Sequence, residues 1–120
     1  MIAGFVDRFG IPFIPTQIAG QDLLGIVDSG FNGDLELPLE IHSDVNALYC
    51  GTVNSRLAGG QVLAEHCYLV TVEFDGTQIC AEATFADSES ALIGTRLMEN
   101  HQLQIDFVRR SVTLTRVTPG

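Results

Sequence analysis

The residues whose types and spacing could support chemistry are concentrated in one segment, 24–33, Leu-Gly-Ile-Val-Asp-Ser-Gly-Phe-Asn-Gly. Two β-branched residues, Ile26 and Val27, precede Asp28, and Gly30 follows it closely. Because Val and Ile favour strands and Gly bends easily, Asp28 is predicted to lie where a strand opens into a tight turn. A carboxylate at the end of an apolar strand is costly to bury alone. The position therefore indicates either a neutralising partner or a carboxylate with a chemical role.

An ordinary turn is the simplest alternative for this segment. In that interpretation the Asp28 side chain accepts hydrogen bonds from nearby backbone N–H groups and does nothing further. A second stretch, Ala91-Leu92-Ile93-Gly94, repeats the pattern of two apolar residues before a glycine, and a helix-like run follows it. The two stretches together are more informative than either one alone.

The segments GIVDSGFNGDLELP and ALIGTRLMENHQLQIDF together resemble the retropepsin-like (clan AA) aspartic proteases, and in particular their small prokaryotic members. The family is marked by two hydrophobic residues before Asp-Thr/Ser-Gly and, later in the chain, two hydrophobic residues and a glycine before a short helix. Here these are Ile26-Val27-Asp28-Ser29-Gly30 and Leu92-Ile93-Gly94. The resemblance covers most of the chain, and it implies a single domain over residues 1–120 with a small closed barrel.

The elements that must position Asp28 are predicted to be short strands. Alternating apolar residues over 68–74 and 79–85 flank Asp75-Gly76 and form the clearest hairpin. Many short strands separated by dense turn signals indicate an all-β fold, which agrees with the closed, mainly antiparallel barrel of the family. Short helices are expected over about 38–46 and 95–101. Two prolines in the strand expected over 11–19, Pro12 and Pro15, indicate an edge position.

Aspartic-protease chemistry uses two carboxylates that share one proton, because like charges about 3 Å apart cannot both ionise. The charged member activates a water as general base, the protonated member donates to the scissile carbonyl, and no metal or other cofactor is required. This sequence contains a single Asp-Ser-Gly. Asp28 is therefore expected to meet its own copy across a two-fold axis, which predicts a homodimeric aspartic endopeptidase acting on peptides or proteins.

The resemblance also implies roles for the residues around the catalytic Asp28. Four residues support the active site: Ser29, whose hydroxyl braces the two loops, Gly30, Ile93 and Gly94. Substrate contacts are expected from Phe31, Asn32 and a mobile flap at Ala58, Gly59 and Gly60, within the turn 57–61. An apolar cleft rimmed by Phe31 and Ile93 would suit hydrophobic side chains. An ordinary hairpin turn is the alternative at Gly59-Gly60.

The sequence departs from the viral members of the family at three points. Phe31 stands where they have a small residue, Asn32 replaces an acidic residue, and Gly94-Thr95-Arg96 replaces Gly-Arg-Asn or Gly-Arg-Asp. Whether Arg96 takes over the salt bridge of the viral dimers is left open. The departures keep a second hypothesis, a non-catalytic dimerisation or peptide-binding module of the same fold. A weaker third is an unrelated β-domain in which Asp28 only caps a turn.

Composition narrows the class of protein further. The 120 residues include 15 acidic and 6 basic ones, for a net charge of −9, so no basic patch is available for nucleic acid. No apolar run is long enough to span a membrane, and early charges and prolines argue against a signal peptide, so the cytoplasm is expected. Three cysteines are predicted to be reduced thiols, with Cys67 and Cys80 in the core or half-buried: Cys50, Cys67 and Cys80.

Overall fold

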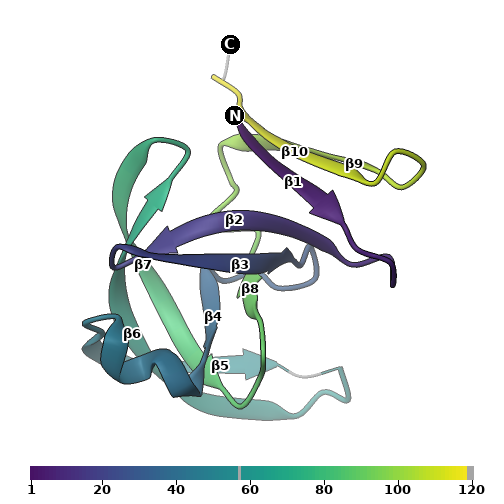
Figure 1. Ribbon diagram of the computed structural model, residues 1–120. Helices are drawn as coiled ribbons and strands as arrows, with labels where there is room; N and C mark the ends of the chain where they lie inside the picture. Colours follow the sequence, from purple (N-terminus) through teal and green to yellow (C-terminus); the bar gives the residue numbers. More distant parts are fainter. Residues whose placement is uncertain (57, 119–120) are drawn as a thin grey trace.

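The computed structural model describes residues 1–56 and 58–118, and in these residues ten strands form one sheet (Figure 1). The strands are β1 (Ile2–Val6), β2 (Pro12–Ile18), β3 (Gln21–Val27), β4 (Leu35–Pro38), β5 (Leu48–Arg56), β6 (Val62–Phe74), β7 (Thr77–Ala86), β8 (Ala91–Ile93), β9 (His101–Asp106) and β10 (Ser111–Arg116), with a 3₁₀ helix, η1 (Leu39–Asp44). The all-β class predicted from the sequence is confirmed.

The strands around Asp28 close on themselves. Within the sheet, β6, β7, β4, β8, β3 and β2 follow one another, and a further pairing of β2 with β6, at Ile18 and Val72, completes the circuit. Most neighbours are antiparallel, but β3 pairs with β8 and β4 with β7 in parallel. The parallel pairing of β3 with β8 places the ends of these two strands side by side, which brings the two sequence motifs to one place.

Four strands extend the sheet beyond this ring, and β5 is the one that pairs with β6. From β2 the order continues through β1, β10 and β9, all antiparallel. In Figure 1 the β9–β10 hairpin projects from the ring, on the side to which the β1–β2 turn also points. The projecting hairpin and the β1–β2 turn therefore border the same side of the molecule.

The core fills the ring with aliphatic side chains from alternate strand positions. Fully buried residues include Ile14 and Ile18 of β2, Leu35 and Leu37 of β4, and Ile93 of β8. Each such side chain contributes about 1.5–3 kcal/mol by leaving water. The alternation of side chains along the strands also determines which cysteines are buried. Cys67 is buried as expected, whereas Cys80 is exposed because its neighbour Ala81 takes the inward position.

One local expectation is wrong, and a second differs in its bounds. The helix over 95–101 does not form: the segment consists of turns, with Glu99 N–H donating to Arg96 O and His101 N–H to Met98 O, because β9 begins at His101 and leaves no room for a longer ladder. The helix over 38–46 is the shorter η1. No helix among residues 1–56 and 58–118 is long and apolar enough to cross a bilayer.

β2 is an inner strand, although its two prolines indicate an edge. Its beginning pairs with β1 and its end with β6 on the same side, while β3 runs along the other. Pro15 lies between these two partners, in the stretch where that side of β2 has neither neighbour. A proline is tolerated there because no ladder hydrogen bond is lost.

Candidate active site

Asp28 lies immediately after β3, where the strand opens into a turn. Its backbone N–H donates to the Ile93 carbonyl at 3.0 Å, which continues the parallel pairing of β3 with β8 by one residue. Its Oδ1 accepts from the Gly30 N–H at 3.0 Å, and its carbonyl accepts from the Phe31 N–H at 3.2 Å. Asp28 is half-buried, so the strand holds its backbone while the carboxylate keeps access to the surface.

The second motif is joined to this turn through backbone hydrogen bonds. Gly94 N–H donates to Asp34 O at 2.9 Å, Thr95 N–H to Phe31 O at 2.8 Å, and Arg96 N–H to Gly33 O at 3.2 Å. The approach is so close that a Cβ on Gly94 would lie 2.0 Å from the Gly33 carbonyl oxygen. Only glycine fits at position 94, and this explains why a glycine follows the two apolar residues of β8.

The Phe31 ring covers this junction. A Cβ added to Gly33 would lie 2.7 Å from the ring, and one added to Gly94 would lie 2.9 Å from it, so the two glycines make room for the ring. Phe31 is half-buried beside Asp28, and the next residue, Asn32, is exposed. The bulky residue that departs from the viral pattern is thus accommodated by packing against backbone.

Asp28 opens into a cleft of about 670 Å³ between the Asp28 turn and the β5–β6 hairpin. Phe31 and Asn32 line it, and Gly30 lies beside Asp28 at its floor. The hairpin contributes Val53, Asn54 and Arg56 from β5 and Glu65 and Cys67 from β6. The cleft is therefore walled by the strands of this hairpin and floored by the two motifs.

The predicted support and flap residues lie in different surroundings. Ser29 is exposed. Ile93 is fully buried, with its side chain against Gly25 in the core, and so it does not lie at the rim of the cleft. Leu92 lines the cleft instead. Ala58, Gly59 and Gly60 are exposed in the turn at the tip of the β5–β6 hairpin, outside the lining of the cleft, and Leu57 lies outside the described residues.

Carboxylates outnumber cationic side chains in the lining of the cleft. Five of them, with two arginines, face the space: Asp28, Asp34, Glu36, Glu65 and Glu82 against Arg56 and Arg96. Sequence reasoning identified only Asp28 among the five. Glu36 could have been found, because it is the outward position between buried Leu35 and Leu37 on the strand that leaves the Asp28 turn. Glu65 comes from the hairpin across the cleft, and no sequence signal links it to Asp28.

Arg96 neutralises part of this charge within its own chain. Its Nη1 donates to Glu82 Oε2 at 2.9 Å, and its Nε lies 3.9 Å from Asp34 Oδ1. The carboxylates of Asp34 and then Glu82 raise the pKa of Arg96. Asp34 also accepts from the Glu82 N–H at 3.0 Å, so these three residues fix the wall of the cleft.

The charged form of Glu36, unlike that of Arg96, is disfavoured by its surroundings. Burial raises the pKa of Glu36 above its ordinary value, and the negative charges of Glu65 and Asp28 raise it further. The carboxylates of Glu36, Glu65 and Asp28 therefore act on one another across the cleft. Within the described part of the chain, no three His, Cys, Asp or Glu side chains converge to hold a metal ion.

Cys67 lies on the wall of the cleft under the β5–β6 hairpin. It is only 4% exposed, and in the ladder it faces Gly51, next to Cys50 at a bulge of β5. Burial, and then the neighbouring Cys50, raises the pKa of the Cys67 thiol to about 12. Cys67 is therefore a protonated thiol at neutral pH.

Comparison with solved structures identifies the fold. A retropepsin-like aspartic protease from Rickettsia conorii matches with a TM-score of 0.69 at 18% identity, over 95% of this chain and 89% of that one. The simian foamy virus (mac) protease matches with 0.57 at 18% identity, over 72% and 91%. The EIAV protease complexed with the inhibitor HBY-793 matches with 0.58 at 15% identity, over 78% and 89%.

The chain therefore has the retropepsin-like fold, and these structural neighbours are aspartic proteases. No family model matches the sequence. No curated protein matches it either.

Proposed function

We propose that this chain is an aspartic endopeptidase that acts as a homodimer on peptide or protein substrates. One observation carries the proposal: in a retropepsin-like fold, Asp28 stands at the end of β3, fixed by Ile93 O and Gly30 N–H, and faces a cleft of about 670 Å³. A carboxylate held in place beside a peptide-sized cleft suits general acid–base chemistry.

The chemistry requires Asp28 from each of two copies. One carboxylate, ionised, takes a proton from water as the water attacks the scissile carbonyl; the other, protonated, donates to the carbonyl oxygen. Ser29 would brace the paired turns, and Gly30, Phe31 and Asn32 would contact the substrate backbone. The β5–β6 hairpin, with Ala58, Gly59 and Gly60 at its tip, would act as the flap that covers the bound peptide and excludes water.

Since the cysteines of this chain are free thiols, we place the enzyme in the cytoplasm.

Cleavage of a mixed peptide library between about pH 4 and 7 tests the proposal, because the proton-sharing pair works below neutrality. We expect Asp28→Asn to lower the rate by at least about 10⁴-fold, since it removes both the base and the acid. Pepstatin should inhibit the wild-type chain. Asp87→Asn, the same exchange on the exposed β7–β8 loop, is the matched control and should cleave as the wild type does.

The outcomes separate the two hypotheses that the sequence leaves open. Loss of cleavage in Asp28→Asn with the dimer retained supports the endopeptidase. A wild-type dimer that cuts nothing but binds peptides, with or without Asp28, contradicts it and supports a peptide-binding module.

A further inference from the structure

Apolar side chains are exposed at the tips of two neighbouring turns. Phe9 in the β1–β2 turn is 73% exposed, and Phe107 and Val108 in the β9–β10 turn are 62% and 94% exposed. Next to them, the rings of Phe5 and Phe13 stack with centroids 5.5 Å apart. We call these five residues the Phe face. Turn tips in a monomer are ordinarily polar, so a group of exposed aromatic side chains here requires an explanation.

Both turns are held rigidly by an aspartate at their base. Asp7 Oδ1 accepts from the backbone N–H groups of Phe9 and Ile11, each at 2.9 Å. Asp106 Oδ1 accepts from Val108 N–H at 3.0 Å and Arg109 N–H at 2.9 Å, and the bond from Arg109 lowers the pKa of Asp106. The apolar tips are thus fixed in an outward position, so binding through them costs little ordering entropy.

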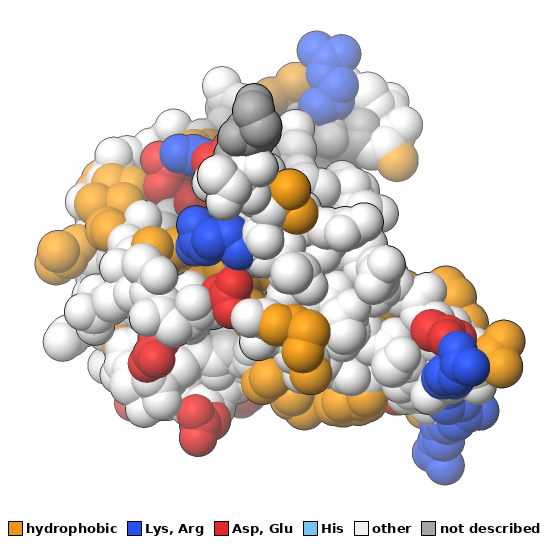
Figure 2. All heavy atoms as spheres, turned by 90° about the horizontal axis from the view of Figure 1, so that it is seen from above, with side chains coloured by type: hydrophobic (Ala, Val, Ile, Leu, Met, Phe, Trp, Pro, Cys, Tyr) orange, Lys and Arg blue, Asp and Glu red, His pale blue; other side chains and the backbone are white. Residues whose placement is uncertain are grey.

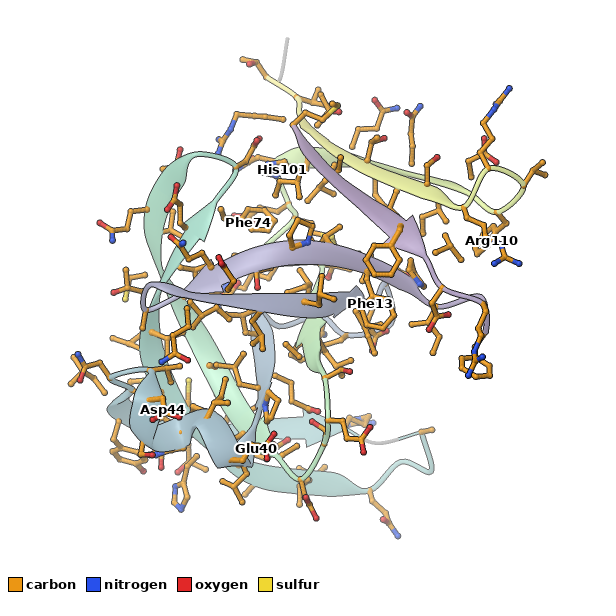
Figure 3. The ribbon with its side chains drawn as sticks, viewed as in Figure 1. Phe13, Glu40, Asp44, Phe74, His101 and Arg110 are labelled. Carbon is orange, nitrogen blue, oxygen red and sulfur yellow. The ribbon has the colours of Figure 1, made fainter. Side chains whose placement is uncertain are left out.

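The Phe face adjoins the Asp28 turn through an unbroken series of contacts. Val6 N–H donates to Arg110 O at 3.0 Å, which ties the β9–β10 turn to the end of β1. Phe5 of β1 pairs with Phe13 of β2, and Phe13 pairs with Ile26 of β3, two residues before Asp28. Figure 3 shows Phe13 and Arg110 toward the same side of the molecule. A second copy that covers this face would therefore also approach Asp28.

Charge favours this face as the meeting point of two copies. The two turns contain Arg8, Arg109 and Arg110, three of the six basic residues of the chain, with only two acids, Asp7 and Asp106. Figure 2 shows basic and hydrophobic side chains gathered at the projecting end of the molecule. These turns thus carry +1, which leaves −10 on the rest of a chain whose net charge is −9. Two copies repel one another least where the Phe faces meet.

We propose that the Phe face is the surface through which two copies of this chain associate, with the two Asp28 turns brought together at its border. This inference rests on the proposed function, because a lone Asp28 leaves the carboxylate pair incomplete. An anionic membrane is a poorer occupant, since polybasic lipid-binding segments carry about four to eight Lys or Arg, and the surplus here is a single charge.

The test is the dimer dissociation constant of the full chain, measured by sedimentation equilibrium. The double variant Phe107→Asp/Val108→Asp should weaken the dimer by at least about 30-fold, because each substitution places a charge in an apolar contact. The matched control is Leu39→Asp/Leu48→Asp, which adds the same charges at leucines of η1 and β5 that are 57% and 67% exposed. It should change the constant by less than about threefold. Both variants should keep the unfolding midpoint of the wild type, since all four side chains are exposed.

The outcomes distinguish this inference from the proposed function. If the dimer forms equally well in the Phe107/Val108 variant while cleavage still requires Asp28, the Phe face is not the interface and the endopeptidase stands. A wild-type chain that stays monomeric overturns the inference. So does binding of the monomer to vesicles of phosphatidylserine and phosphatidylcholine that the same variant abolishes, because a lipid surface would then occupy the face.

Discussion

The cleft and the Phe face adjoin the same strand end, β3, but they are built from opposite materials. The cleft lining carries five carboxylates and two arginines, and two of the carboxylates, Asp34 and Glu82, form ion pairs with Arg96. The Phe face carries aromatic side chains, a slight positive surplus and turns braced by one aspartate each. The cleft is thus the more negative of the two regions, which suits the proposed roles of a peptide-binding cleft and a face between two copies. Recognition at the cleft should therefore be electrostatic, and recognition at the face hydrophobic.

The largest expected effect comes from breaking the junction of the two motifs at the floor of the cleft. In Gly94→Ala the new Cβ would meet the Gly33 carbonyl oxygen at 2.0 Å, and this backbone atom is itself held by Arg96 N–H. We expect a loss of about 3 kcal/mol or more in the free energy of unfolding, measured by urea denaturation. The control is Gly59→Ala, whose Cβ would meet nothing within 4 Å. Equal midpoints for the two variants would contradict the close approach of the two motifs.

The next largest effects should come from salt and from peptide charge, which are expected to act differently on the cleft and on the Phe face. At low ionic strength we expect peptides with Lys or Arg beside the scissile bond to be cleaved roughly tenfold more efficiently than matched peptides with Glu, because the cleft is negative. Added salt should erase this preference by screening. The dimer dissociation constant should stay constant or fall with salt, since screening relieves the repulsion between two chains of charge −9.

Two carboxylates of the cleft provide the matched variant for that experiment. Glu36→Gln/Glu65→Gln should remove most of the preference for basic peptides, and Glu40→Gln/Glu89→Gln, at exposed positions outside the cleft, should leave it intact. Steady-state kinetics on the paired peptides measures both. A preference that survives the loss of Glu36 and Glu65 charge would show that these residues do not recognise the substrate.

The smallest effect concerns the stability of the cleft itself. Because the pKa of Glu36 is raised above its ordinary 4.5 in the folded chain, the folded state binds more protons than the unfolded state above that pH, and ionisation of Glu36 destabilises the fold. Glu36→Gln should therefore stabilise the chain at neutral pH, by about 0.5 kcal/mol or less because water screens this half-exposed group. The gain should disappear as the pH falls below 4.5. Urea titrations at both pH values measure it, and a loss of stability at neutral pH would contradict it.

Local patterns in the sequence predict most strands and turns of this fold. The hairpin around Asp75-Gly76 and the strand before Asp28 follow from alternation and turn dipeptides. The helix over 95–101 was predicted wrongly because β9 begins at His101, and its pairing with β10 is a contact that the local pattern does not show. The edge position that Pro15 indicated for β2 was wrong for the same reason, because a change of partner strand along β2 does not show in the local sequence.

The residues of the candidate site also fall into two groups, those that a local sequence pattern identifies and those that it does not. Asp28 and Gly94 carry a recognisable pattern, whereas the Glu36–Glu65 pair and the Arg96–Glu82 ion pair depend on how distant strands are placed. Ile93 was expected at the rim, but alternation along the short β8 turns it inward and gives the rim to Leu92.

The buried thiol of Cys67 can serve as a probe for opening of the β5–β6 hairpin. With a pKa of about 12 and 4% exposure, the Cys67 thiol should react slowly as long as the strands around it stay packed, whereas Cys50 and Cys80 are exposed. Once Cys50 and Cys80 are replaced by serine, the slow modification of Cys67 by a thiol reagent reports the fraction of time that the cleft wall is open. A peptide that binds under the hairpin should slow this modification, so occupancy of the cleft becomes measurable without any bond being cut.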